Sequence, residues 1–182
     1  MTLLGAAQAG SAEAQDLLPV DVAAQPMIHT EAGTLRSCGL RLFAAHVDSN
    51  SWIVAVETSI DVYVDGKGSF KGEVSEFSAP TQRRNANPVP VAVESIWVKS
   101  PDTAATRPIL GKVDKGEGGH ELLYAIEADS AIALMLSGIK GESILFGFKR
   151  SGSPASHIYI GVPKLARDES EQLQRCLSNL TK

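Results

Sequence analysis

Residues 54–74 read VAVETSIDVYVDGKGSFKGEV, and this stretch decides the fold. In its first half every second position is apolar or β-branched, which is the period of a strand with one buried face. These positions are Val54, Val56, Thr58, Ile60, Val62 and Val64. The positions between them include Glu57, Ser59 and Asp61, which suit a face in water. The pattern predicts a long, half-buried strand.

A hairpin is predicted immediately after this strand. Asp65-Gly66 is typical of a two-residue hairpin turn, and the alternation then resumes. The resumed pattern consists of Phe70, Gly72 and Val74. Working outward from the hairpin, similar apolar runs predict further strands at 38–46, 91–99, 109–113, 121–126, 143–149 and 157–162.

Two helices are predicted in the last third of the chain. The first has apolar residues at helical spacing and either Asp129 or Ser130 as its N-cap. The second begins at Asp168, which together with Glu171 resembles a capping box. Its apolar stripe consists of Leu173, Cys176, Leu177 and Leu180. Residues 36–182 are therefore predicted to form one α+β domain, predominantly antiparallel, built as a sandwich or a partly open barrel.

The N-terminal segment, residues 1–35, is rich in small residues and contains neither lysine nor arginine. The charged region of a secretory signal is missing, but Ala7-Gln8-Ala9 and Ala12-Glu13-Ala14 both fit the small-x-small cleavage rule. We interpret this segment as a flexible leader that holds the remnant of a signal peptide. That interpretation predicts a periplasmic or secreted bacterial protein. The alternative is an Ala/Gly-rich tail on a cytoplasmic protein.

The chain has two cysteines, Cys38 and Cys176. An even number of cysteines in an exported chain indicates a disulfide, which would clamp the last helix onto the first predicted strand. The alternative is a pair of reduced, buried cysteines that behave as small hydrophobic residues. No C-x-x-C motif is present, so neither a thioredoxin-like site nor a zinc ribbon is indicated.

Composition excludes some classes of function. The chain has 182 residues, of which 43% are hydrophobic and 21% charged, as in an ordinary globular domain. A net charge of −4 argues against a nucleic-acid partner. No apolar run approaches the roughly 20 residues that span a membrane, so we expect a soluble protein. The Pro-rich loop with Arg83, Arg84 and Asn85 is a candidate binding loop, or else a solvated connection without a partner.

The sequence contains no recognisable catalytic motif, and it predicts no catalytic site, no metal site and no cofactor. The four histidines are dispersed and lack metal-ligand spacing; they are His29, His46, His120 and His157. No G-x-S-x-G elbow is present. Acidic residues on predicted strands are typical of solvated faces, although a hydrolase would need such a pair in space; they include Glu73, Glu76 and Glu94.

The helix-strand-strand-helix order from Asp129 through Leu180 resembles the layout of small exported bacterial proteins of the invasion-associated locus B type. The resemblance covers the last third of the chain and rests on the order of the elements. The chain lacks the additional cysteines expected in that family, so no function is transferred from it.

Three functional hypotheses follow. The first is an exported, non-enzymatic module that binds a protein or another component of the bacterial envelope. The second is a hydrolase whose acid and base residues converge only in three dimensions. The third is a carrier of a small ligand, which would require a closed barrel with an apolar cavity.

Overall fold

The computed structural model describes residues 17–48, 51–78, 87–116 and 119–180. The helices are α1 (Ala128–Lys140) and α2 (Arg167–Leu180), and a short 3-10 turn, η1, spans Ile109–Gly111. The strands are β1 (Leu17–Pro19), β2 (Asp21–Glu31), β3 (Thr34–Val47), β4 (Trp52–Tyr63), β5 (Gly68–Ser78), β6 (Val89–Pro90), β7 (Val93–Lys99), β8 (Asp114–Lys115), β9 (Glu121–Ile126), β10 (Ile144–Arg150), β11 (Ser156–Gly161) and β12 (Pro163–Lys164).

The strands form two sheets. The larger sheet has the order β12-β2-β3-β4-β5-β9-β8, with β6 added beside β5, and the smaller has the order β1-β11-β10-β7. The pairs β1–β11 and β12–β2 are parallel, and the other strand pairs of the described residues are antiparallel. Neither strand order closes into a barrel. The predicted fold class, an antiparallel-rich α+β fold with two helices near the C-terminus, is confirmed.

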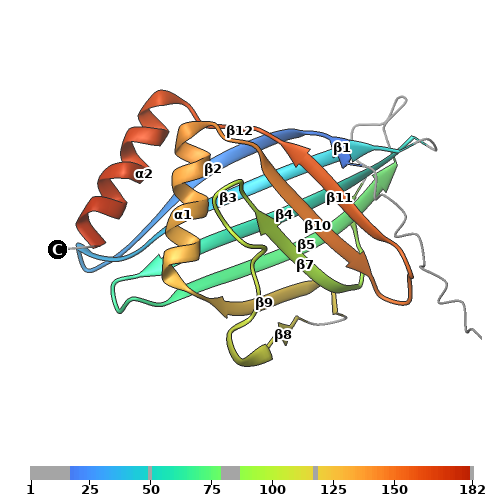
Figure 1. The fold of residues 1–182 in the computed structure, drawn as a ribbon, viewed down its shortest axis with the longest axis horizontal. Coiled ribbons are helices and arrows are strands. Elements are labelled where there is room, and N and C mark those ends of the chain that lie inside the picture. The colour runs from blue at the N-terminus through green and yellow to red at the C-terminus, as the bar shows by residue number, and fades with distance from the viewer. Residues whose placement is uncertain (1–16, 49–50, 79–86, 117–118, 181–182) are drawn as a thin grey trace, which may run out of the picture.

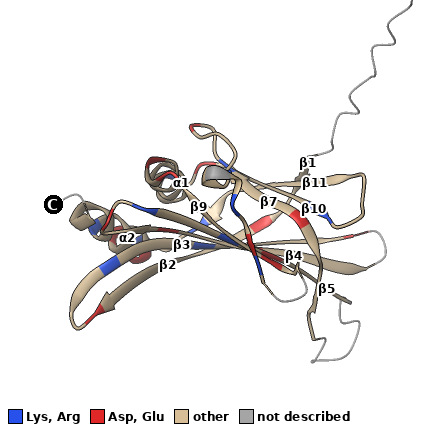
Figure 2. Cartoon of the chain, turned by 90° about the horizontal axis from the view of Figure 1, so that it is seen from below, with Lys and Arg blue, Asp and Glu red and all other residues tan. Residues whose placement is uncertain are grey.

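One face of the larger sheet carries a second layer, which consists of the smaller sheet and α1 side by side (Figures 1 and 2). α1 packs on β4 and β5, while α2 covers β2 and β3. Up to the bulge between His29 and Thr30, the strand pairs keep even residues opposite even ones, and the even-numbered positions of β2 to β5 and β9 point into this interface. Leu40, Val56, Ile60 and Phe70 on this inner face are fully buried, so the core lies between the two layers.

The β4–β5 hairpin confirms the predicted alternation but not the predicted turn. The Tyr63 amide donates to the Lys67 carbonyl at 2.8 Å, so three residues, 64–66, form the loop instead of two. Gly66 takes the left-handed conformation, with φ of +78°, that such a loop requires. The buried residues are even-numbered on both strands. Only a loop with an odd number of residues can place them on the same face of the sheet.

The predicted leader boundary is wrong. The sequence assigned residues 1–35 to a flexible leader, whereas residues from Leu17 to Glu31 form β1 and β2. β2 pairs with β3 along its whole length and contributes buried Val22 to the core. The domain therefore includes this segment, and only residues 1–16 of the expected leader lie outside the described residues.

Three local expectations also need correction. The strand expected at 109–113 is the turn η1, followed by the two-residue strand β8. The N-cap of α1 is Glu127, which makes no side-chain cap. α2 begins one residue before the expected Asp168, and the Glu169 carboxylate accepts the Ala166 amide at 2.8 Å. This bond is one half of a capping box, shifted along the chain from the expected position.

The two sheets share a corner. The chain passes from β1 in the smaller sheet to β2 in the larger one, and again from β11 to β12. On the side of β9, the Tyr124 hydroxyl donates to the Ile96 carbonyl at 2.8 Å and lies 3.1 Å from the Thr106 hydroxyl. Burial raises the pKa of Tyr124 to about 12, which keeps this hydroxyl protonated.

Cys38 and Cys176 lie at disulfide distance, with sulfur atoms 1.94 Å apart and Cα atoms 5.8 Å apart. Both residues are buried. The bond links β3 to α2, which is the clamp that the sequence predicted.

Candidate functional site

The binding loop predicted at Arg83, Arg84 and Asn85 lies outside the described residues. The described surface offers another candidate, the outer face of the larger sheet, which the second layer leaves uncovered (Figure 2). Odd-numbered residues of β2 to β5 and β9 point outward there. The candidate site is built from these residues.

Three glutamates form a row across this face. Glu57 on β4 lies directly opposite Glu73 on β5, and Glu73 lies directly opposite Glu121 on β9. Like charges in direct cross-strand pairs destabilise a sheet. The row therefore opposes the stability of the fold, and such local conflicts are expected at functional positions.

Two cations partly offset the row. Arg41 pairs with Glu57, and the Lys71 ammonium lies 2.7 Å from the Glu121 carboxylate. The hydrogen bond to Glu121 raises the pKa of Lys71, and the charges of Glu73 and Glu57 act in the same direction. Glu73, in the middle of the row, belongs to no ion pair of the described residues. Its carboxylate remains an acceptor for a ligand.

The row lies in a groove that crosses the strands. Three adjoining hollows of about 430, 250 and 480 Å³ make up the groove, and Glu57 borders all three. The groove is defined by the side chains of Gln25, Arg41, Phe43, Glu57, Lys71, Glu73, Phe77 and Glu121 together with Pro88, Pro90 and His120. It therefore combines carboxylates, two cations and apolar walls, which is chemistry suited to an extended polar ligand.

A separate apolar hollow of about 790 Å³ lies on the same face, near the β4–β5 turn. Tyr63, Val113 and Leu123 border it and are 40%, 37% and 41% exposed. Exposed apolar side chains that gather in one hollow are typical of interaction surfaces.

Between the groove and the β2–β3 turn lies Asp61. It is the direct partner of Gly39, and a Cβ atom at Gly39 would fall 2.3 Å from Asp61 Oδ1. Because Gly39 has no side chain, the Asp61 carboxylate can occupy the space beside it. Burial raises the pKa of Asp61, and the charge of His29 opposes that shift.

The structure separates the remaining residues that the sequence singled out. His46 and His157 lie between the two sheets, whereas Glu94 pairs with Lys149 at 2.5 Å on the smaller sheet. Within the described residues, no three His, Cys, Asp or Glu side chains are arranged to hold a metal ion. The groove was missed because sequence alternation indicates a polar face but not the register that aligns Glu57 with Glu73.

No protein-family model, curated protein or solved structure matches the chain. Among the described helices, none has the length and apolar character needed to cross a membrane.

Proposed function

We propose that this protein is an exported, non-enzymatic binding module of the bacterial envelope, and that the groove on the larger sheet holds its partner. The observation that carries the proposal is the in-register row of Glu57, Glu73 and Glu121 inside a continuous groove. The row costs stability, and a ligand that supplies positive charge or hydrogen-bond donors recovers that cost. The disulfide supports export, because such bonds persist in oxidising compartments.

The partner that fits best is an extended protein segment with a basic side chain. Glu73, which forms no ion pair with the residues that the structure describes, offers its carboxylate to that side chain, while Phe43 and Phe77 offer apolar contacts on the same face. Pro88 and Pro90 add further apolar wall to the same hollow. Recognition would then combine one charge contact with apolar packing.

The row also favours a second candidate, a glycoside hydrolase. Glycosidases use two carboxyl groups that flank the scissile bond, and the direct pair Glu57–Glu73 brings two carboxyl groups to neighbouring strands. Arg41 engages Glu57, however, so within the described part of the chain only Glu73 of this pair lacks an ion-pair partner. Binding is therefore the better-supported function. A small-ligand carrier would need a closed barrel, and neither sheet closes into one.

The groove is tested with two fluorescent peptides, one of alternating lysine and serine and one of alternating glutamate and serine. Anisotropy should show binding of the basic peptide only. Glu73→Gln should weaken it about tenfold, as expected when a charged hydrogen bond is lost. Glu94→Gln removes a carboxylate of the smaller sheet, outside the groove, and should leave binding unchanged.

The proposal fails if neither peptide binds, or if Glu73→Gln and Glu94→Gln have the same effect. Release of sugar from a chromogenic glycoside that stops in Glu73→Gln would instead establish the hydrolase. Export is tested separately by the intact mass of the native protein, with and without reductant before alkylation. Retained residues 1–16 together with two freely alkylated thiols would contradict export.

A further inference from the structure

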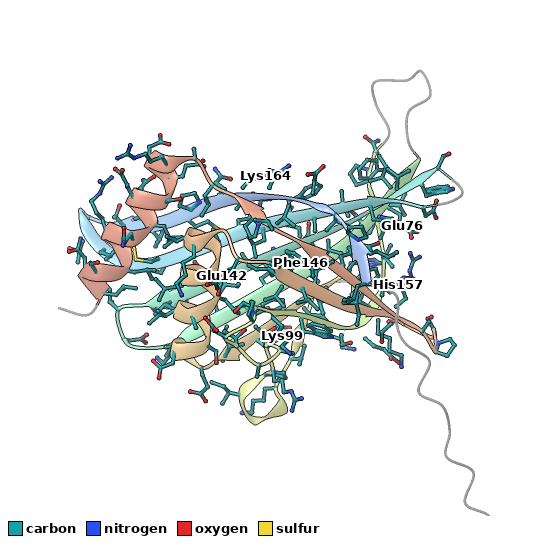
Figure 3. All side chains as sticks on the ribbon, turned by 45° about the horizontal axis from the view of Figure 1, so that its top comes forward. Glu76, Lys99, Glu142, Phe146, His157 and Lys164 are labelled. Atoms are coloured by element: carbon teal, nitrogen blue, oxygen red, sulfur yellow. A yellow bond between two sulfur atoms is a disulfide. The ribbon has the colours of Figure 1, made fainter. Side chains whose placement is uncertain are left out.

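At one end of the two sheets, inward-facing positions carry several polar side chains, although most of the inner face is apolar. On β3, His46 follows buried Ala44, and on β5, Glu76 follows buried Val74. On β10, Arg150 takes the same inward position after Phe148. We call the following residues the inter-sheet cluster: His46, Glu76, Arg150, His157 and Tyr159. Figure 3 shows Glu76 and His157 at the same end of the molecule.

The inter-sheet cluster connects the two layers. Arg150 from the smaller sheet forms an ion pair with Glu76 from the larger sheet. His157 lies directly opposite Phe148, and their rings stack with centroids 4.9 Å apart. Arg150 is two residues beyond Phe148 and is therefore a diagonal neighbour of His157, within reach of a long side chain.

One donor of the cluster has no acceptor. Arg150 Nε is buried and forms no hydrogen bond with the described residues, because the guanidinium meets Glu76 through Nη2. Nε–H and a neighbouring Nη–H form a second fork, which matches the two oxygens of a carboxylate or phosphate group. A buried donor without a partner costs free energy, so a ligand oxygen at this point would be favoured.

The charges around Arg150 Nε determine how much net positive charge the site offers to an anion. Glu76 already neutralises Arg150, and Asp48 adds a negative charge that acts on Tyr159. An anion therefore gains a hydrogen-bonding fork but little net positive charge unless another group is protonated. His157 is that group. Burial and the charge of Arg150 lower its pKa, although the charge of Glu76 opposes that shift, so a neighbouring anion would favour the protonated ring. His46, the other histidine of the cluster, lies beside Tyr159, with the ring centroids 5.5 Å apart and the ring planes tilted by 42°.

We propose that the inter-sheet cluster binds an oxyanion, the carboxylate or phosphate group of a ligand, between Arg150 Nε and the imidazole of His157, which takes up one proton from water as the anion binds. Glu76 holds the guanidinium in place from the opposite sheet. The site is independent of the groove, since Glu76 faces the interior of the two layers whereas the groove lies on the outer face.

The experiment follows the ring proton signals of His157 by NMR as pH is varied, with His157→Gln used to assign them. Titrations are run in inorganic phosphate, in acetate and in chloride of matched ionic strength. Phosphate or acetate should raise the pKa of His157, because a bound anion stabilises the imidazolium, and chloride should not. Arg150→Lys, which keeps the charge but loses the fork, should weaken the effect about tenfold. Lys149→Gln, on the outer side of the same strand, should leave it unchanged.

Each outcome decides the proposal. A response to both anions supports a general oxyanion site, and a response to phosphate alone supports a phosphate-bearing ligand. An unchanged pKa of His157 in both anions, or an equal rise in chloride, would overturn the proposal. The wild-type titration does not depend on Arg150→Lys, so misfolding of that variant would not prevent the decision.

Discussion

The indole of Trp97 lies across Gly147, its direct partner on the neighbouring strand. A Cβ atom at Gly147 would fall 2.0 Å from both Cε2 and Cζ2 of Trp97. No side chain can occupy that point while the indole keeps its position. Glycine at 147 is therefore what allows a tryptophan to lie flat on the outer surface of the smaller sheet.

Gly147→Ala should destabilise the protein by about 1–3 kcal/mol, the usual range for overpacking, because the indole must move. Urea unfolding of the variant and the wild type measures the difference. In a background of Trp97→Ala the same substitution should cost much less. An equal cost in both backgrounds would show that the indole is not the cause.

Replacing both Cys38 and Cys176 by serine should lower the free energy of unfolding. The two cysteines are 138 positions apart, and the chain-entropy model gives about 5 kcal/mol for closing so long a loop. Unfolding of the wild type with and without reductant should reproduce the loss seen in the double variant. If the double variant keeps wild-type stability, the disulfide does not contribute to the fold.

Asp61 should make stability fall as pH rises. Its pKa is raised in the fold, so the folded state holds the proton more tightly than the unfolded chain does. The resulting stabilisation is complete below the ordinary aspartate pKa of 3.8 and is lost as pH increases through the folded pKa. Asp61→Asn should therefore gain stability relative to the wild type at pH 7 but not at low pH. A difference independent of pH would contradict this assignment.

His157 should produce the opposite dependence. Its pKa is lowered in the fold, so its contribution to stability is present above the ordinary histidine pKa of 6.5 and is lost as pH falls through the folded pKa. His157→Gln should flatten the stability profile below pH 6.5. Chemical unfolding at several pH values, in a buffer without phosphate or carboxylates, checks the prediction. Equal slopes for variant and wild type would count against it.

The sequence predicted the central part of the fold because alternation is a strong signal there. Val56, Ile60 and Phe70 are buried as the pattern indicates. The same alternation is incompatible with the expected two-residue turn, because even-numbered residues that are buried on both strands require a loop with an odd number of residues. β2 was missed because its alternate positions include Ala24 and Pro26, which have low strand propensity. Pro26 is tolerated because β12 pairs only with positions 22 and 23 of β2.

The candidate site could not be predicted to the same degree. Periodicity places Glu57 and Glu73 on polar strand faces, but the one-to-one alignment depends on the length of the loop between their strands. Glu121 joins the row only through the long-range pairing of β5 with β9. Arg150 and Glu76 meet because two different sheets stack, and no local pattern encodes that distance. The prediction of the site is therefore limited by sequence separation and strand register. It is not limited by the types of residue present.

The separation of the two cysteines along the chain also determines how early in biosynthesis the disulfide can form. A ribosome adds roughly 5–20 residues per second, so Cys176 emerges on the order of ten seconds after Cys38. Until then the thiol of Cys38 has no partner in its own chain and is open to mixed disulfides with other molecules. Every truncated product that ends between Cys38 and Cys176 retains one unpaired thiol, so that thiol alone distinguishes these unfinished chains from finished ones.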